Sequence, residues 1–231
     1  MRVIVNVGVG FWYAKGSMRL NDSLINVGYK GKRQIYSGFY PNQCPKHEAN
    51  NYGFKAYGIR DAVEAGGTSI LWCDSSIYAV KSPEPIFDII DSQGYYFIDN
   101  GNNCAQTATD KCLTNFGITR DEAEKIPEST TCVFGFSMLH EKGKAFYEKF
   151  IYHESIGSFN GGRTHRDEDS TDKRFWFSRH DQTVASLIAG TTSMNNLNKY
   201  GDHVMYYSDN SGRTTNKITD SVCLINHGHV K

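Results

Sequence analysis

Apolar residues are grouped along the chain in blocks whose spacing switches between that of a strand and that of a helix. Residues 2–9 form a β-rich apolar run that ends in Gly-Val-Gly, which predicts a buried first strand followed by a tight loop. Residues 13–27 carry apolar side chains at helical spacing and are expected to form a helix. Residues 68–73 form another short apolar run, which ends directly before Asp74.

The alternation of strands and helices continues to the end of the chain. Further strands are expected at 33–40, 94–98, 130–139 and 204–207, and further helices at 48–65, from 83 onward, and at 107–116, 121–125, 141–153 and 178–189. The polar residues 99–103 are expected to form a loop. This order predicts a single α/β domain over residues 1–231, with a mainly parallel, nucleotide-binding sheet flanked by helices.

One long segment breaks the pattern. Residues 156–173 have no apolar period, contain the Gly161-Gly162 pair and are rich in charge. A mobile surface loop is therefore expected there. Its basic residues could close over a phosphate as a lid.

The composition of the chain argues against some classes of binding partner. The 231 residues include 25 basic and 25 acidic side chains, and without a basic excess a nucleic-acid partner is not favoured. No apolar run is long enough to predict a membrane span. The first residues do not resemble a signal peptide, and none of the six cysteines forms a Cys-x-x-Cys pair, so reduced thiols in the cytoplasm are expected.

Two short polar segments are candidates for chemistry. Asp74-Ser75-Ser76 follows a buried strand, and ligands of open α/β sheets bind beyond the carboxyl ends of the strands. The alternative is an ordinary turn, in which Asp and Ser bond to the local backbone. Asp181 and Gln182 stand at the start of a predicted helix, where the carboxylate binds a sugar hydroxyl or is simply stabilised by the helix dipole.

Four segments of the chain, and the order in which they follow one another, resemble the nucleotide-diphospho-sugar glycosyltransferases of the glycosyltransferase-A fold. This family includes compact domains encoded by large algal viruses. Asp74-Ser75-Ser76 stands where that family carries its Asp-x-Asp signature, and the resemblance spans residues 3–207. The other three segments are Tyr13-x-x-Gly16-x-x-x-Leu20, Phe54-Lys55-x-x-x-Ile59-x-x-Ala62 and Arg179-His180-Asp181-Gln182-Thr183.

The resemblance implies transfer of a sugar from a UDP- or GDP-sugar to a glycan or glycoprotein acceptor. It implies catalytic roles for Asp74, Asp181 and Gln182. Donor-binding roles are expected for Asn6, Val7, Gly8, Val9, Gly10, Tyr13, Lys55, Ser75, Ser76, Arg179 and His180. Asn100 and Asn102 are further candidates for the sugar pocket, although Asn-Gly is also common in turns.

The resemblance also implies a divalent cation, Mn²⁺ or Mg²⁺, bound by Asp74, Ser76 and His227. Ser76 departs from the family pattern, which usually has a second aspartate, and a hydroxyl is a poorer ligand than a carboxylate. A weakly held metal is therefore expected, unless side chains alone neutralise the diphosphate. Basic candidates for that role are Lys55, Arg163, His165, Arg166, Arg179, His227 and His229.

Other interpretations stay open. The serine in the signature also fits a degenerate module that binds nucleotide sugar without turnover. A nucleotidyltransferase is less favoured, because residues 8–12 contain no basic side chain to bind phosphate. An inverting reaction would need a carboxylate base, for which Asp181, Asp99 or an acid within 167–172 are candidates, whereas a retaining one would not.

Overall fold

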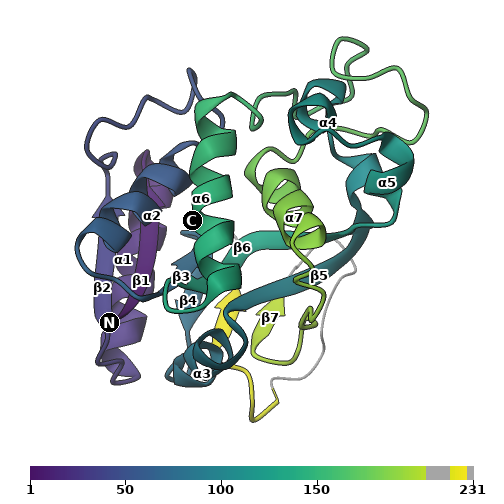
Figure 1. The fold of residues 1–231 in the computed structure, drawn as a ribbon. Coiled ribbons are helices and arrows are strands. Elements are labelled where there is room, and N and C mark those ends of the chain that lie inside the picture. The colour runs from purple at the N-terminus through teal and green to yellow at the C-terminus, as the bar shows by residue number, and fades with distance from the viewer. Residues whose placement is uncertain (207–218, 228–231) are drawn as a thin grey trace.

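The computed structural model describes residues 1–206 and 219–227, which fold into a twisted sheet between two layers of helices, with a smaller sheet beside it (Figure 1). Within this part of the chain the large sheet has the order β2-β1-β3-β6-β5. Its strands are Arg2–Gly8 (β1), Lys32–Ser37 (β2), Ser69–Cys73 (β3), Tyr95–Asn103 (β5) and Pro127–Ser137 (β6). The small sheet has the order β4-β8-β7, with strands Ile77–Ala79 (β4), Val204–Tyr206 (β7) and Leu224–Asn226 (β8).

The direction of the strands confirms the mainly parallel α/β fold. β1 pairs parallel with both β2 and β3. β6 runs antiparallel to β3 and to β5, so β6 alone opposes the other strands of the large sheet. The carboxyl ends of β1, β2 and β3 therefore meet at one edge, which is the upper edge of the sheet in Figure 1.

Helices cover both faces of the large sheet, as the alternation of strands and helices in the sequence predicts. α2, α6 and α7 lie on one face, and α1 and α3 lie on the other (Figure 1). The helices are Phe11–Asn26 (α1), Phe54–Glu64 (α2), Glu84–Gln93 (α3), Asp110–Phe116 (α4), Arg120–Glu124 (α5), Glu141–Ser155 (α6) and Asp181–Thr191 (α7), with a 3-10 turn at Cys104–Gln106. No helix of the described residues is long and apolar enough to cross a membrane.

An apolar core lies on each face of the large sheet, and successive residues of β3 point alternately into one core and the other. Ile70 and Trp72 pack on the α2 side, while Leu71 and Cys73 pack on the α1 side. Because both faces of the strand are buried, it is apolar from Ile70 to Cys73 and gives no alternation in the sequence. The first polar side chain after this strand is Asp74, at the edge where the strand leaves the core.

Two expectations about local structure are wrong, and two short strands were not expected. The helix predicted at 48–65 begins only at Phe54, because Tyr52 has a φ of 57° and donates its N–H to His47 Nδ1 at 3.1 Å. Residues 99–103 are the end of β5 rather than a loop, since they pair with β6 through two irregularities in register. β4 and β8, with three residues each, are too short to show a period and were not predicted.

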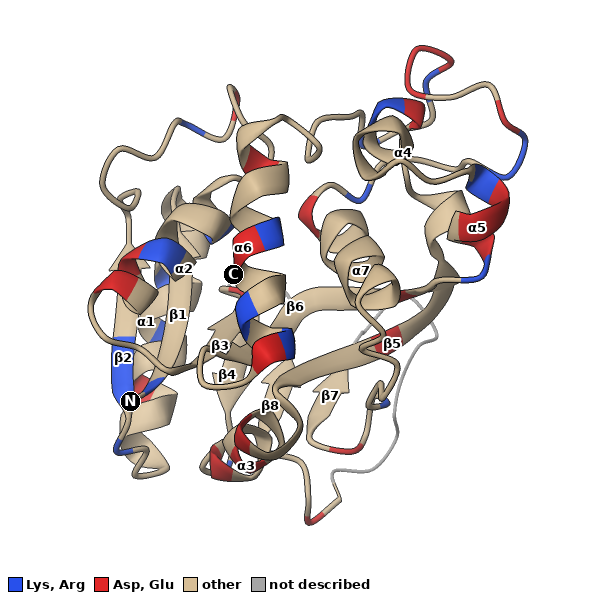
Figure 2. Cartoon of the chain, viewed as in Figure 1, with Lys and Arg blue, Asp and Glu red and all other residues tan. Residues whose placement is uncertain are grey.

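The segment 156–173 contains no helix or strand, as predicted, and its mobility stays a prediction. Figure 2 shows that charged residues are dense on this loop and on the neighbouring α5. The loop is nevertheless attached to the rest of the chain. The N–H of Asp110 at the start of α4 donates to the carbonyl of Asp169 at 2.9 Å, and buried Ser170 accepts from Arg120 at 3.2 Å.

Candidate functional site

A cavity of about 330 Å³ lies beyond the end of β3, between α2, the start of α7 and the 156–173 loop. It is lined by Tyr52, Lys55, Asp74, Thr131, Cys132, Arg163, Phe177, Ser178, Arg179, His180, Asp181 and Gln182. A larger depression of about 490 Å³ runs along α1, but it is a surface groove with a single carboxylate, that of Asp22. The chemistry therefore concentrates in the cavity at the end of β3.

Four side chains, which we call the inner cluster, form the floor of this cavity: Lys55, Asp74, Thr131 and Asp181. The ammonium of Lys55 lies 3.0 Å from Asp74 Oδ1 and 2.9 Å from Asp181 Oδ2, and it donates to the Thr131 carbonyl at 2.9 Å. The hydroxyl of Thr131 donates to Asp181 Oδ2 at 2.7 Å. One buried cation thus joins two carboxylates that are far apart in the sequence.

The charges of the inner cluster depend on each other. Burial disfavours the ammonium of Lys55, but the carboxylates of Asp181 and Asp74 outweigh this effect and raise its pKa. Asp181 is almost completely buried and is the first residue of α7, where the helix dipole favours a negative charge. Asp74 is the more open carboxylate, with its side chain 28% exposed, and it also accepts from Trp72 Nε1 at 2.7 Å.

Two residues with unusual backbone conformation meet at the wall of the cavity. Tyr52 and His180 have φ values of 57° and 54°, and their rings lie 5.2 Å apart. Positive φ costs energy for side chains of this size and is typical of functional sites. His180 Nδ1 lies 3.0 Å from the Phe159 carbonyl, which can only accept, so this nitrogen carries the proton. Burial lowers the pKa of His180, so the ring is neutral at pH 7.

Two buried polar atoms of the cavity lining have no hydrogen-bond partner among the described residues. They are Nε2 of His180, which is an acceptor in this tautomer, and the amide nitrogen Nε2 of Gln182, which is a donor. Both side chains are 4% exposed. An orphaned buried polar atom costs about 1–3 kcal/mol, so this wall is suited to a polar ligand with both hydroxyl hydrogens and oxygens.

The signature segment 74–76 forms the turn between β3 and β4. The N–H of Asp74 bonds to the Cys132 carbonyl at 2.8 Å, and Ile77 closes the turn with a 3.0 Å bond to the carbonyl of Asp74. Ser75 points away from the cavity into a neutral network with Asn6 and Ser17, which we call the turn cluster. Its hydroxyl lies 3.3 Å from Asn6 Nδ2 and 3.1 Å from Ser17 Oγ.

A glycine makes the turn cluster possible. A Cβ at Gly8 would collide with the hydroxyl oxygens of Ser17 and Ser75, so β1 can approach the turn only at a residue without a side chain. Asn6 and Ser75 are buried, with 0% and 7% exposed. The geometry therefore gives these two residues a place in the support of the turn and does not bring them to the cavity.

Ser76 and His227 lie side by side, although 150 residues separate them in the sequence. β8 pairs with β4 so that Asn226 lies opposite Ile77, and the N–H of His227 donates to the Ser76 carbonyl at 3.1 Å. The small sheet therefore brings His227 next to the signature. His229 lies outside the described residues.

The residues expected to form the nucleotide wall lie at the end of β1, outside the cavity. Val7 and Gly8 are buried, whereas Gly10 is exposed and has a φ of 90°. Tyr13, 46% exposed, is on the first turn of α1, next to Trp12, which is similarly exposed, and Phe11, which is more exposed. The sheet edge thus carries an exposed aromatic rim beside the polar cavity.

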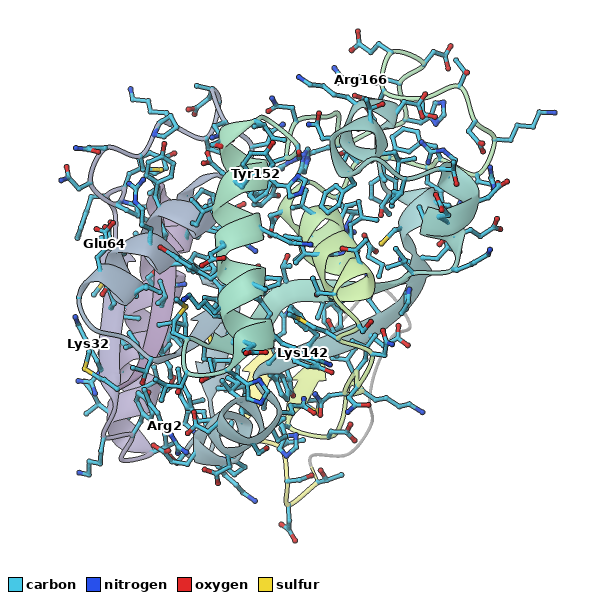
Figure 3. The ribbon with its side chains drawn as sticks, in the orientation of Figure 1. Arg2, Lys32, Glu64, Lys142, Tyr152 and Arg166 are labelled. Atoms are coloured by element: carbon cyan, nitrogen blue, oxygen red, sulfur yellow. The ribbon has the colours of Figure 1, made fainter. Side chains whose placement is uncertain are left out.

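Several sequence candidates are not brought to the cavity. Asp99 accepts from the N–H of Gly101, and Asn100 donates to Glu128, in the far part of β5; Asn102 is in the same stretch. His165 lies 3.3 Å from Asp167, and Arg166 pairs with Asp169. Figure 3 shows Arg166 on the outer part of the loop, near the edge of the molecule. Of the basic residues in this loop, Arg163 is the one that lines the cavity.

The sequence analysis missed part of the lining: Tyr52, Thr131, Cys132, Phe177 and Ser178. Thr131 and Cys132 lie on β6, next to Asp74 across the sheet. Burial and the carboxylate of Asp74 raise the pKa of Cys132 to about 11, so its thiol is protonated. In the sequence these residues stand near the start of a predicted strand. Small polar residues are common at strand starts, so this position did not indicate a site.

Comparisons with known proteins agree with the fold. No family model matches the chain, and no curated protein matches it. A solved glycosyltransferase involved in glycosylation of the major capsid of the algal virus PBCV-1 is similar with a TM-score of 0.56 and 11% identity, covering 97% of this chain and 91% of that one. Mouse xyloside xylosyltransferase 1 is similar with a TM-score of 0.53 and 7% identity, covering 98% and 96%.

The bifunctional glycosyltransferase WbbM is similar with a TM-score of 0.56 and 9% identity over 98% of this chain and 45% of its own. All three neighbours are glycosyltransferases, so the resemblance seen in the sequence is confirmed at the level of fold. At these identities the likeness shows the fold alone, and the activity has to be argued from the site.

Proposed function

We propose that this protein is a glycosyltransferase that moves a hexose or pentose from a UDP- or GDP-sugar to a glycan or glycoprotein acceptor. The observation that carries the proposal is the inner cluster, in which Lys55 bridges Asp74 and Asp181 at the floor of a polar cavity. The cavity lies at the edge of the sheet where α/β folds bind ligands, and the chain has the fold of glycosyltransferases. All six cysteines are free thiols, as a cytoplasmic location requires.

The donor fits across two parts of the sheet edge. The nucleoside would lie at the end of β1, against the backbone from Asn6 to Gly10 and the exposed ring of Tyr13. The sugar would enter the cavity, where the orphaned Gln182 amide donates to a hydroxyl and His180 Nε2 accepts from one. The diphosphate then lies between them, above Asp74.

The inner cluster gives the cavity a fixed electrostatic pattern before any ligand binds. Asp181 is held from below by Lys55 and Thr131, so its orientation does not depend on the substrate. A carboxylate in this position stabilises the positive charge that develops on the sugar as its bond to the diphosphate breaks. Lys55 bridges both carboxylates and sets their separation.

The residues present fit a divalent cation only in part. Asp74 and His227 are near the signature, but Asp74 Oδ1 is already engaged by Trp72 and Lys55, and Ser76 offers a hydroxyl. The described residues contain no group of three His, Cys, Asp or Glu side chains placed to hold a metal. We therefore propose that Asp74 and His227 would hold Mn²⁺ or Mg²⁺ only weakly. Such a cation supplies positive charge to the leaving diphosphate.

A panel of nucleotide sugars tests the proposal directly. At a concentration a hundredfold above its Kd, the true donor should stabilise the protein by about 2.7 kcal/mol, raising Tm by several degrees in a thermal-shift assay with and without Mn²⁺. Release of nucleoside diphosphate from that donor, with an acceptor panel present, then measures turnover. If no nucleotide sugar or nucleoside diphosphate raises Tm, the proposal is wrong.

The same assay separates the enzyme from a second candidate. Ser76 in place of an acidic residue favours a module that binds nucleotide sugar without using it. That module would show the rise in Tm but no release of nucleoside diphosphate under any acceptor or metal condition. Hydrolysis of the donor by water in the absence of acceptor would already exclude it.

A further inference from the structure

Two arginines that line the cavity, Arg163 and Arg179, form no ion pair with an acidic residue in the part of the chain that the structure describes. Among the described residues, no carboxylate lies within ion-pair distance of Arg163 or Arg179, although Lys55 in the same cavity has two such partners. Arg166, three residues from Arg163, pairs with both Glu168 and Asp169. An arginine of the loop thus forms ion pairs outside the cavity, whereas the arginine of the same loop that lines the cavity forms none among the described residues.

Neutral groups nevertheless hold both guanidinium groups in place. Arg163 donates to the Tyr52 hydroxyl at 2.8 Å, lies 3.1 Å from His47 Nε2, and stacks over the ring of Tyr52 with its Cζ 5.4 Å from the centroid. Arg179 donates to Gln182 Oε1 at 3.3 Å. Aromatic and amide partners orient a guanidinium without cancelling its charge, and its remaining N–H groups stay free for a ligand.

The charges of the cavity do not balance, in contrast to those of the whole chain. The chain has 25 basic and 25 acidic residues. The cavity lining has three cations, Lys55, Arg163 and Arg179, against the two carboxylates Asp74 and Asp181, so its formal charge is +1. Because Lys55 is enclosed by the two carboxylates, the excess lies with the arginines.

Arg163 and Arg179 lie on the side of the cavity that is away from β1, where the nucleoside is proposed to bind. Arg179 precedes α7, which packs on β6, and β6 lies across β3 from β1. Arg163 belongs to the loop that joins α6 to α7 (Figure 1). The donor approaches from the end of β1, so the region beyond its sugar, where an acceptor has to enter, is the region that these arginines border.

We propose that Arg163 and Arg179 form a subsite for an anionic group of the acceptor, a phosphate or a carboxylate. This inference rests on the proposed function and gives its acceptor a chemical class: an acidic or phosphorylated glycan. Guanidinium groups bind such planar or tetrahedral anions through two parallel hydrogen bonds, which fixes the acceptor's orientation as well as its charge. The orientation would place an acceptor hydroxyl against the donor sugar above Asp181.

Calorimetry with defined probes tests the subsite. Glucose 6-phosphate, glucuronate and glucose are titrated into the protein in the presence of saturating UDP or GDP, which fills the place of the donor diphosphate. The two anionic sugars should bind and glucose should not. The subsite assigns both arginines to the acceptor, whereas the resemblance in the sequence implied a place on the donor side. Arg163→Gln and Arg179→Gln should therefore each weaken the anionic sugars by about tenfold or more and leave the Kd of the nucleoside diphosphate unchanged.

Arg166→Gln is the matched control, because it removes the same charge from the same loop at a position that already has acidic partners. It should not change the binding of either probe. Binding of the anionic sugars that persists in the double variant Arg163→Gln/Arg179→Gln would overturn the subsite. So would competition between anionic sugar and nucleoside diphosphate together with loss of the nucleotide in the variants, since the arginines would then serve the donor. If wild type binds neither UDP nor GDP, the proposed function itself fails, which is a different result.

Discussion

Two polar clusters stand beside each other at the same edge of the sheet, and they differ in charge and in whether they face the cavity. The inner cluster of Lys55, Asp74, Thr131 and Asp181 is charged and forms the floor of the cavity. The turn cluster of Asn6, Ser17 and Ser75 is neutral, buried and apart from the cavity.

Both clusters contain residues that the signature segment marks as site candidates, since Asp74 and Ser75 are neighbours in the chain. In the turn between β3 and β4 one of them faces the cavity and the other faces the core. Charged side chains that face a cavity can stabilise the charge that develops on a substrate during the reaction. A neutral, buried hydrogen-bond network can instead hold a turn rigid. The comparison predicts that the two clusters respond differently to mutation.

The largest effect is expected from Lys55→Met. This substitution leaves the almost completely buried Asp181 without its cation, which costs about 3–5 kcal/mol of unfolding free energy. Urea unfolding measures it, and Lys144→Met on the exposed face of α6 serves as the control. The double variant Lys55→Met/Asp181→Asn should recover part of the loss, because no buried charge is then unpaired. A single variant as stable as the control would show that the ion pairs contribute nothing.

The contribution of Lys55 also has a defined pH dependence. Its pKa is raised in the folded state, so its stabilising effect is fully present below the pKa of an unfolded lysine, about 10.4, and declines as the pH rises further. The difference in unfolding free energy between wild type and Lys55→Met should therefore be constant near neutral pH and narrow above about pH 10. A difference that widens with pH would contradict the assigned charge.

Asp74→Asn is expected to keep the fold and lose activity. Asn retains an oxygen for Trp72 Nε1 but removes the carboxylate that pairs with Lys55 and would hold the divalent cation, so kcat/KM should fall by about a hundredfold or more. Asp99→Asn is the comparison, since Asp99 bonds to Gly101 on β5 and does not line the cavity. Near-wild-type turnover of a folded Asp74→Asn protein would remove Asp74 from the site.

A smaller effect is expected at Ser76, which belongs to neither cluster. Ser76→Asp adds a carboxylate next to His227 and should tighten Mn²⁺ binding by about tenfold, equivalent to about 1.4 kcal/mol. Titration of Mn²⁺ followed by calorimetry gives the value, and excess chelator should abolish the activity of wild type. Full activity in chelator would show that side chains alone neutralise the diphosphate.

The smallest effect is expected from Ser75→Ala in the turn cluster. It removes a hydroxyl shared by Asn6 and Ser17 and should cost about 1 kcal/mol of stability. Because the hydroxyl does not line the cavity, kcat should stay within about tenfold of wild type. A loss of activity as large as that of Asp74→Asn would mean that Ser75 contacts the substrate and that the two clusters are one site.

The sequence by itself determined the α/β class, the order of most elements and the position of Asp74 beyond a buried strand. These features depend on local periodicity and on the burial of whole strands, which leave a pattern in neighbouring residues. The Asp181-Gln182 pair at a helix start was visible for the same reason. The sequence also marked 156–173 as a segment without regular structure, because its apolar residues have no period.

Only the tertiary structure decided which of these residues meet. The contact of Lys55 with Asp74 and Asp181 joins three separate elements, and that of Ser76 with His227 depends on a strand of three residues. The inward turn of Ser75 requires Gly8 on another strand. Such contacts are set by the register and packing of segments that are far apart in the sequence. The local pattern of residues around each position therefore does not predict them.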